Sequence, residues 1–475
     1  MADQAALAAA AKASPVIPLF VRAWPAGTAA LGDLSVPGGA SRWWLSKSLA
    51  SLDNSLRELG SRLTLRSGDP VAVIEALIEQ TGASAVHFQR HYEPDDRVTE
   101  ERLRTMLASR SVAAKRYCGG LLFEPDEIKT GSGTPFKVYS PFARACFSAP
   151  PPKPAQPVPS SLASPAAWPS SERLDDWGLH PTRPDWSGGL AEAWDPGEAG
   201  AEVLLSAFLD GPVRDYSEQR DRPDIAATSR LSPHLHFGEI SIRSVWQRTQ
   251  LAAAADPKLA RGAEKFLKEL LWREFSAHLL CQFEALPSAP FRPEFARFPW
   301  AKDQSAYEAW TKGQTGYPVV DAGMRELWQT GIMHNRVRMV VASFLIKHLL
   351  IPWQRGEAWF HDTLVDADLA NNAASWQWVA GSGADAAPYF RIFNPVTQGQ
   401  KFDPDGNYVR RYVPELAKLP APDIHAPWLS APAVLAAAGV LLGSTYPAPI
   451  VDHAFARERA LAALAAIKID ASTNA

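Results

Sequence analysis

The segment Phe266–Phe275 combines an acid, an aromatic ring and a base in a predicted helix. Glu269, Trp272 and Arg273 are spaced i, i+3 and i+4, so one helix face carries a carboxylate, an indole and a guanidinium together. An indole beside two ions is typical of a face that binds a planar, polar ligand. The same spacing also suits an ion pair on a helix surface beside a core tryptophan, so this face leaves both interpretations open.

A second segment, Met333–Met339, has the same design. Asn335, Arg338 and Met339 share a face, whereas Arg336 points elsewhere. Arginines next to an asparagine and soft methionines could hold a phosphate and an aromatic ring at once. An exposed charged turn explains the segment equally well.

A third segment is rich in oxygen ligands: Asp366, Asp368 and Asn372 precede Trp376 and Trp378. It lacks the glycine and the terminal glutamate of a calcium-binding loop, so we expect no metal there. Carboxylates and amides also bind the polar edge of a heterocycle and the hydroxyls of a sugar chain.

The segment Thr228–Ser232 offers three hydroxyls, backbone amides and Arg230 ahead of a predicted helix at 241–249. Hydroxyls, amides and a guanidinium are the groups that bind a diphosphate. Hydroxyl clusters more often cap helices, and each of the four segments is weak evidence when taken alone.

The composition of the chain limits the number and the kind of domains that can carry these residues. The 475 residues are 46% hydrophobic with a formal net charge of −3, which allows two to four domains and excludes a disordered tail or a uniformly basic nucleic-acid coat. Three scattered cysteines form no disulfide framework, so we expect a reducing, cytoplasmic setting. We find neither a secretory signal nor a membrane-spanning run. Tryptophan is abundant, with 17 residues.

Residues 1–130 alternate apolar runs with amphipathic segments, which predicts an α/β domain with about four parallel strands. The expected strands are 16–21, 63–65, 85–89 and 113–117, and the expected helices are 5–12, 43–59, 71–81 and 96–107. The chain enters its first helix without a strand before it, so we expect the first strand of the sheet to be missing. In a doubly wound sheet that first strand lies centrally.

Residues 131–190 are predicted to be an interdomain linker, since eight prolines between Pro150 and Pro169 exclude a helix or a central strand. From 191 to 475 the apolar residues follow a helical period, notably in 264–281, 319–330 and 333–350. We therefore expect a larger all-α domain.

Taken together and in order, these motifs resemble the flavin domain of the photolyase/cryptochrome family. The resemblance rests on Tyr216 with Arg220-Asp-Arg-Pro, Thr228-Ser-Arg-Leu-Ser, Glu269-Leu-Leu-Trp-Arg-Glu-Phe, Thr315-Gly-Tyr-Pro-Val-Val-Asp-Ala, Met333-His-Asn-Arg-Val-Arg-Met, Asp366-Ala-Asp-Leu-Ala-Asn-Asn, and Trp376-Gln-Trp to Arg391-Ile-Phe-Asn-Pro. It spans most of 204–464, and the α/β half and the linker fit the family architecture.

The resemblance implies that FAD lies folded in a U within the helical domain. Asn372 would face flavin N5, and Arg338 would approach the phosphates or the flavin. The other residues implied to bind the cofactor are Tyr216, Thr228, Ser229, Arg230, Leu231, Ser232, Asp366 and Asp368.

The substrate face looks most like that of a bacterial class I enzyme for cyclobutane pyrimidine dimers, because the histidines expected in enzymes for (6-4) photoproducts are absent at Asn335 and near Met339. By resemblance, Trp272 and Trp378 would sandwich the dimer, and Glu269, Asn335 and Met339 would line its pocket. Arg273 would lie on the same face. Arg336, Arg391 and Lys401 would contact DNA phosphates around the flipped-out lesion.

Trp300, Trp353 and Trp376 match the family's tryptophan chain, which would pass electrons from the surface to oxidised flavin. Ordinary core packing is the alternative for each of these indoles. The implied reaction is light-driven repair: excited reduced flavin donates an electron to the dimer, the ring splits and the electron returns.

The nearest rival is a cryptochrome-like photoreceptor without repair activity. A dark flavin oxidoreductase would need a dinucleotide fingerprint that we do not find, and three cysteines cannot ligate an iron–sulfur cluster. A second, antenna chromophore would be methenyltetrahydrofolate, a deazaflavin or FMN, and the residues do not decide which. We expect a monomer that acts on damaged DNA.

Overall fold

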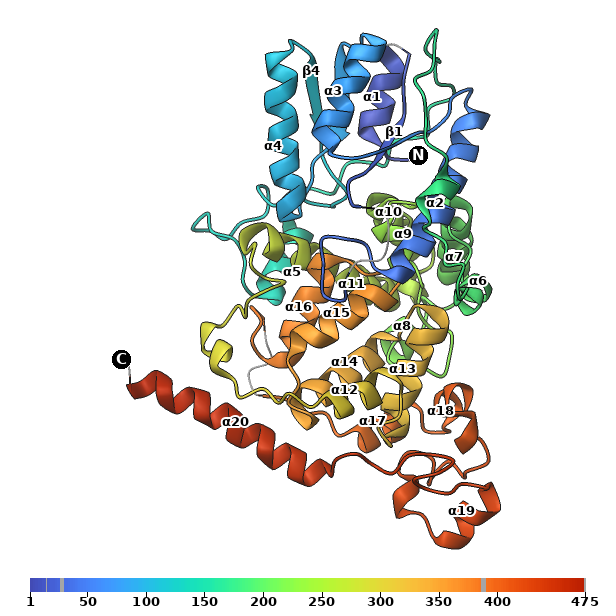
Figure 1. The fold of residues 1–475 in the computed structure, drawn as a ribbon, viewed down its shortest axis with the longest axis vertical. Coiled ribbons are helices and arrows are strands. Elements are labelled where there is room, and N and C mark those ends of the chain that lie inside the picture. The colour runs from blue at the N-terminus through green and yellow to red at the C-terminus, as the bar shows by residue number, and fades with distance from the viewer. Residues whose placement is uncertain (14, 26–29, 386–389, 474–475) are drawn as a thin grey trace. The chain divides into compact units, whose positions relative to one another are not determined.

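The computed structural model describes residues 1–13, 15–25, 30–385 and 390–473, the last six of them as backbone only. The chain divides into two compact units. The first unit comprises Met1–Arg214 and Ser229–Glu284, and the second comprises Asp215–Thr228 and Ala285–Ala475. Figure 1 follows the chain from its blue N-terminus to its red C-terminus. The predicted diphosphate segment thus begins in the second unit and continues in the first.

Four short parallel strands confirm the predicted α/β region. β1 (Leu19–Arg22) pairs with β2 (Thr64–Ser67), and β3 (Ala85–Gln89) pairs with β4 (Ala113–Tyr117). The strands form two separate pairs rather than one sheet, because no described residue takes the place of a central strand between them.

The helices of this region begin and end close to the predicted residues. α3 shows why: the Asp69 carboxylate caps it, Pro70 opens it, and Gly82 closes it with a φ of +65°. α2 buries Trp43 and Trp44. The four helices are α1 (Ala5–Ala13), α2 (Gly39–Glu58), α3 (Pro70–Thr81) and α4 (Pro94–Ser109).

The segment predicted as a linker is irregular where its prolines cluster, but it also contains helices. α5 (Tyr139–Ser148) buries Tyr139, Phe142, Ala143 and Cys146, the spacing of an amphipathic helix. The short helix η1 (Leu174–Trp177) and the start of α6 (Gly188–Ala193) also fall within it. The first unit runs through this segment to Arg214, so the boundaries 131 and 190 remain predictions.

α11 is the long helix of the first unit, and it covers the predicted range 264–281 completely. It packs closely on the chain before it, since a Cβ at Gly262 would lie 1.7 Å from the Val213 carbonyl oxygen. The remaining helices of this unit are α7 (Glu198–Asp210), α9 (Ser232–His236), α10 (Ile242–Ala255), η2 (Pro257–Leu259) and α11 (Ala260–Gln282).

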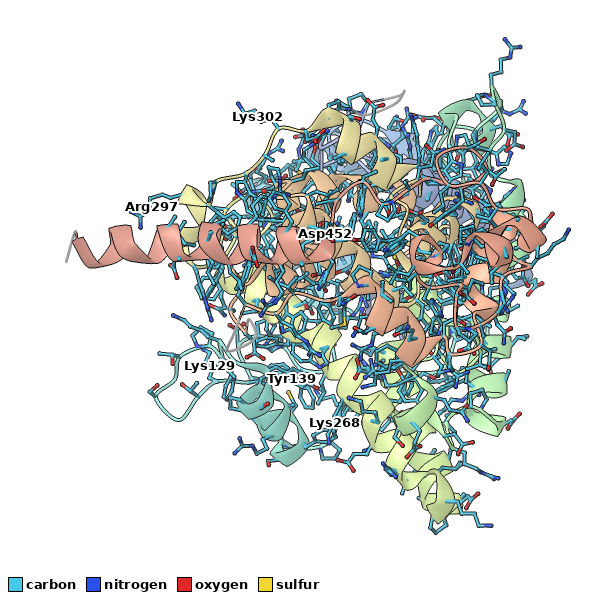
Figure 2. All side chains as sticks on the ribbon, turned by 90° about the horizontal axis from the view of Figure 1, so that it is seen from below. Lys129, Tyr139, Lys268, Arg297, Lys302 and Asp452 are labelled. Atoms are coloured by element: carbon cyan, nitrogen blue, oxygen red, sulfur yellow. The ribbon has the colours of Figure 1, made fainter. Side chains whose placement is uncertain are left out.

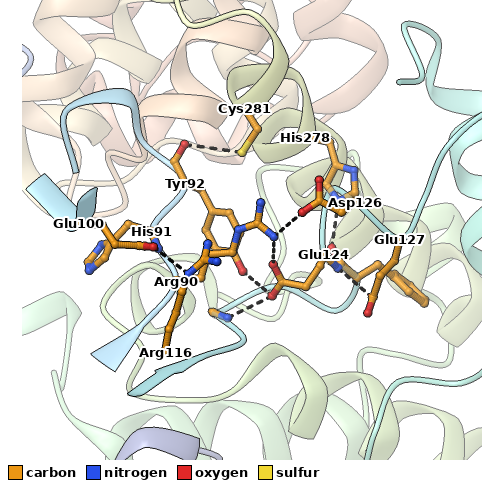
Figure 3. Close-up of polar contacts among 12 residues, drawn as sticks. Arg90, His91, Tyr92, Glu100, Arg116, Glu124, Asp126, Glu127, His278 and Cys281 are labelled. Atoms are coloured by element: carbon orange, nitrogen blue, oxygen red, sulfur yellow. Dashed lines mark hydrogen bonds and ion pairs between the residues drawn. The ribbon is translucent and has the colours of Figure 1, made fainter. Parts of the chain in front are cut away.

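A polar network ties the end of β3 to the loop before α5 and to α11 (Figure 3). Arg90 pairs with Glu124 at 3.0 Å and with Asp126 at 2.8 Å, and the Tyr92 hydroxyl donates to Glu124. From α11, a ring nitrogen of His278 lies 3.0 Å from the Phe123 carbonyl oxygen. These contacts hold the loop at 119–127 against the helix that carries Glu269 and Trp272.

The second unit is helical and has a large aromatic core that includes Trp310, Tyr317, Phe344, Trp353 and Trp376. None of the helices in the described part of the chain is long and apolar enough to cross a membrane. The elements are α8 (Tyr216–Gln219), η3 (Pro293–Arg297), α12 (Gln304–Thr311), α13 (Pro318–Thr330), α14 (Asn335–Ser343), η4 (Phe344–His348), α15 (Trp353–Thr363), α16 (Leu369–Ala380), α17 (Pro395–Phe402), α18 (Asn407–Tyr412), η5 (Pro414–Leu416), η6 (Pro427–Leu429), α19 (Pro432–Ala438) and α20 (His453–Thr473).

The helix predicted over 333–350 is not one regular α-helix. α14 ends at Ser343, and the chain continues as the π-helix η4, which buries Lys347 and His348. Both buried side chains make a polar contact there: Lys347 donates to the Arg391 carbonyl, and His348 Nε2 lies 2.8 Å from His453 Nδ1. The wider turn therefore places two polar side chains that a continuous apolar stripe does not predict.

Candidate functional site

The face of α11 predicted to meet the substrate is present in the first unit. Glu269, Trp272 and Arg273 are all partly exposed. Glu269 lies 3.2 Å from the Lys265 ammonium, and Arg273 donates to the Leu235 carbonyl at 3.4 Å. The Trp272 indole stacks on the Tyr139 ring, with centroids 3.6 Å apart and planes 7° apart. The helix thus presents a carboxylate and a partly covered indole on one side.

α14 in the second unit separates its two arginines as predicted. Arg336 pairs with Asp221 at 2.7 Å and lies over the Phe402 ring, whereas Arg338 pairs with Asp366. Asn335 is exposed and Met339 is half-buried, and they lie four residues apart on one face. The ion pair to Asp221 leaves Arg336 less open to a DNA phosphate than the exposed Arg391.

His334 caps α14 through Nδ1, which accepts from the Arg336 amide. Burial lowers its pKa to about 4, so this ring is neutral at pH 7 and adds no charge to the face.

Asp366 and Asp368 come from the loop between α15 and α16, and they differ in their partners. Both carboxylate oxygens of Asp366 accept from Arg338, at 3.0 and 2.9 Å. Asp368 caps α16 by accepting from the Asn371 amide at 2.8 Å. These bonds fix the start of α16, and Asn372 lies in its first turn.

Asn372 points toward α15, where its amide donates to the Glu357 carbonyl at 3.0 Å. The Glu357 side chain is 1% exposed, and its Oε1 has no hydrogen-bond partner among the described residues. Burial raises the pKa of Glu357 to about 9, so it is a neutral acid at pH 7.

Sequence reasoning missed Glu357. The available signal is its position within the buried stripe of α15 formed by Trp353, Gly356, Glu357 and Phe360. A carboxyl group on an otherwise apolar helix face is a candidate functional residue.

The diphosphate segment is built as a turn followed by α9. Arg230 has a φ of +55°, lies over the Trp194 ring at 4.2 Å, and donates to the Ala193 carbonyl. The Ser229 hydroxyl accepts from the Leu231 amide at 3.4 Å, and Leu231 itself is buried. Ser232 is exposed at the start of α9, and Thr228 is half-buried. Tyr216 is buried in α8, with the Arg220 guanidinium 5.7 Å from its ring.

The three indoles of the predicted electron chain all lie in the second unit. Trp376 and Trp353 are buried, and Trp300 is half-buried against Phe298 at 4.4 Å. A Cβ at Gly356 would lie 2.1 Å from Trp376, so glycine is required where α15 and α16 meet. Trp376 also contacts two further rings, Phe360 at 5.0 Å and Trp310 at 6.3 Å.

The other predicted substrate residues also lie in the second unit. Trp378 is partly buried against the core, and Lys401 is exposed at the end of α17. Arg391 lies over the Phe393 ring at 4.8 Å.

The donor set suits a flavin dinucleotide better than a metal. In the described part of the chain no three His, Cys, Asp or Glu side chains group as metal ligands. The two aspartates that a calcium site would need are engaged by Arg338 and by the start of α16. The buried Glu357 Oε1, in the residue whose main-chain carbonyl accepts from Asn372, has no partner among the described residues and could meet the polar edge of a flavin ring.

Two family models match this chain. Residues 1–160 match the model described as DNA photolyase, and residues 266–466 match the FAD binding domain of DNA photolyase. The second match covers α14 to α16 and the α11 face, which carry most of the residues described above.

Relatives match over nearly the whole chain. A deoxyribodipyrimidine photo-lyase of Agrobacterium fabrum is 51% identical over 98% of this chain and 95% of its own length. Cryptochrome-1 of Arabidopsis thaliana is 42% identical over 96% of this chain and 67% of its own length.

Solved structures agree with these sequence matches. A bacterial class III photolyase from Agrobacterium tumefaciens has a TM-score of 0.93 at 51% identity, covering 98% of this chain and 95% of that one. A Synechocystis cryptochrome has a TM-score of 0.86 at 29% identity, covering 97% and 96%. The fold, the FAD-binding domain and these near full-length matches show that the chain belongs to the photolyase/cryptochrome family.

Proposed function

We propose that this protein uses light to repair cyclobutane pyrimidine dimers in DNA. The observation that carries the proposal is the α11 face, where Glu269 and Trp272 are partly exposed together in a chain 51% identical to a deoxyribodipyrimidine photo-lyase. When bound, reduced FAD supplies the excited electron that splits the dimer. The protein must bind the cofactor, receive the lesion and exclude water.

The cofactor would be held mainly by second-unit residues whose positions are already fixed. Arg338 and Asp366 form a rigid pair that would sit at the phosphates and the flavin, and Asn372 would hydrogen-bond at N5. Glu357, whose main-chain carbonyl accepts from Asn372, would keep its proton, since burial raises the pKa of its carboxyl to about 9. Tyr216, Thr228, Ser229, Leu231 and Ser232 would hold the diphosphate.

By the family resemblance, Trp272 and Trp378 would each stack on the lesion, and Asn335 and Met339 would also contact it. The Glu269 carboxyl would hydrogen-bond a pyrimidine and stabilise the charge that develops on it. Stacking on an indole tolerates any pyrimidine, so recognition of the joined pair would come from the shape of the slot. Arg391 and Lys401, both exposed, would contact phosphates.

The second candidate is a photoreceptor without repair activity, which the 42% identity to an Arabidopsis cryptochrome favours. Both candidate functions require FAD and the tryptophan chain, so neither of these two features distinguishes a repair enzyme from a photoreceptor. Retention of Glu269, Trp272 and Trp378 favours the repair enzyme.

A repair assay separates the two functions. Purified protein is mixed with a duplex carrying a thymine dimer, and dimer content is measured after blue or near-ultraviolet light and in the dark. Repair in light alone, lost in Glu269→Ala while bound FAD is unchanged, supports the enzyme. Photoreduction of FAD without repair would establish the photoreceptor instead.

We further expect a cytoplasmic monomer that binds DNA damaged by pyrimidine dimers. The class I assignment stays a prediction, because the Agrobacterium neighbour is a class III photolyase. An absorption spectrum tests the antenna: bands beyond those of flavin would show methenyltetrahydrofolate or a deazaflavin, whereas FMN would appear only on chromophore extraction.

A further inference from the structure

One residue outside every motif described above lies directly against the substrate face. Tyr139, the first residue of α5, stacks on Trp272 with ring centroids 3.6 Å apart. Tyr139 as a whole residue is 9% exposed. Trp272 therefore has one face of its indole covered by protein, while the side chain as a whole remains partly exposed.

Tyr139 is itself held in place from α11. Its hydroxyl donates to the Lys268 carbonyl at 2.6 Å, one helical turn before Trp272 (Figure 2). Phe275, the next aromatic residue of α11, meets both rings edge to face at 6.0 Å. Both the ring and the hydroxyl of Tyr139 therefore contact α11, the helix that carries the Trp272 indole.

The rest of α5 and the loop before it are also docked on α11. Phe142 is fully buried between Phe275 at 5.3 Å and His278 at 4.9 Å. The fully buried Glu274 carboxyl group accepts from the Leu122 and Phe123 amides at 2.9 and 3.3 Å. These contacts leave the Tyr139 ring little freedom to move away from the indole.

We propose that Tyr139 is a positioning residue: its ring holds the Trp272 indole in the orientation that receives a pyrimidine dimer on its remaining surface. This inference rests on the proposed function of Trp272. An unsupported indole would occupy several rotamers, and binding would have to select one of them. A stacked indole has already lost that freedom, so the lesion binds more tightly without touching Tyr139.

The test measures affinity for a dimer-containing duplex and for the same undamaged duplex. We expect Tyr139→Ala to weaken dimer binding about 3- to 10-fold, the factor for ordering one side chain, and to leave undamaged-duplex affinity and FAD content unchanged. Under saturating light, KM for the lesion should rise by the same factor with kcat unchanged. Tyr139→Phe keeps the stack and should restore affinity to within about twofold. Tyr117→Ala is the matched control, because Tyr117 stacks on His87 in the same unit.

Trp272→Ala and the double variant separate the possible failures. If Trp272→Ala alone does not weaken dimer binding, the proposed slot is wrong. If it does, and Tyr139→Ala leaves affinity unchanged or adds its full effect to that of Trp272→Ala, the positioning role is wrong. Should Tyr139→Ala fail to fold, Tyr139→Leu retains apolar volume without the ring and is expected to show the same weakening. Wild-type affinity in Tyr139→Leu would overturn the inference.

Discussion

The α/β region and the second unit place their charged side chains differently. In residues 1–117 carboxylates pair with arginines, at the surface as in Arg102–Asp69 and Arg57–Asp53, or buried as in Glu100 with Arg116. In the second unit Asp321, Glu357 and Asp403 are buried in a helical core, and burial raises the pKa of each.

This difference has a physical cause. The two strand pairs are short and β4 is largely exposed, so the α/β region has little interior, and its buried Glu100 keeps an arginine partner. The second unit has enough apolar volume to bury acids, and hydrogen bonds satisfy Asp321 and Asp403 but not the Glu357 Oε1. Buried acids with raised pKa values are typical of functional sites, in line with our proposal that the second unit holds most of the cofactor.

The largest expected effect concerns the indoles of the second unit. Trp376→Phe should abolish light-driven reduction of oxidised FAD, because phenylalanine is far harder to oxidise than indole. Chemically pre-reduced Trp376→Phe enzyme should still repair dimers. Trp177→Phe, at a buried indole of the first unit, is the control and should photoreduce normally. Failure of pre-reduced Trp376→Phe to repair would place Trp376 in the active site or the core instead.

The contrast between buried and surface carboxylates predicts a difference in stability. Asp321 accepts from the Thr315 amide and hydroxyl, the Gly316 amide and the Tyr446 hydroxyl, all inside the second unit. Asp321→Ala leaves these donors unpaired and should lower the free energy of unfolding by about 3–5 kcal/mol. Asp69→Ala loses a helix cap and an exposed ion pair, and should cost about 1 kcal/mol. Denaturant titration measures the free energy of unfolding of both variants. Equal losses would refute the difference between buried and surface carboxylates.

Trp272→Ala tests whether the first unit contributes to substrate binding at all. Removing the stacking surface should weaken binding of a dimer-containing duplex roughly 10- to 100-fold, or about 1–3 kcal/mol, while FAD content stays at the wild-type level. Fluorescence titration with lesion and undamaged duplex provides the measurement. Loss of FAD from this variant would mean that α11 supports the cofactor rather than the lesion.

The pH dependence of Glu357 gives the most specific effect. Because its pKa is raised from 4.5 to about 9, the folded protein keeps a proton that the unfolded chain releases above pH 4.5. Wild-type stability from this group is therefore full below pH 4.5 and falls as the pH rises toward 9, by at most about 1.4 kcal/mol per pH unit. Glu357→Gln removes that slope, so its advantage over wild type should grow between pH 6 and pH 8. A constant difference across this range would show that Glu357 is ionised in the folded protein.

Much of the fold was predictable because local spacing decides it. The ranges of β3 and β4 are exact, and the helices α2, α3, α11 and α13 follow their apolar periods. Two predictions were incomplete. The segment predicted as a helix over 333–350 is helical from Asn335 to His348, but it changes at Phe344 from an α-helix to the π-helix η4, which places Lys347 and His348. The predicted linker contains the helix α5, whose first residue, Tyr139, stacks on Trp272.

The site residues, like the fold, were predictable where local spacing along a helix decides their position. Glu269, Trp272 and Arg273 share a face because helical geometry places residues three and four apart together, and so do Asn335 and Met339. From these local patterns, in order along the chain, the sequence alone determined the family and the helical flavin domain, and it predicted the substrate face.

Only the tertiary structure decided which of these groups have partners. Arg336 pairs with Asp221, 115 residues away, and Tyr139 donates to the Lys268 carbonyl, 129 residues away. Glu357 becomes a neutral acid because packing closes over it. Residues so far apart in the chain meet only when long-range packing buries them, and burial sets their charge and orientation. No spacing along the sequence encodes that, which is why Glu357 and Tyr139 emerged from the structure alone.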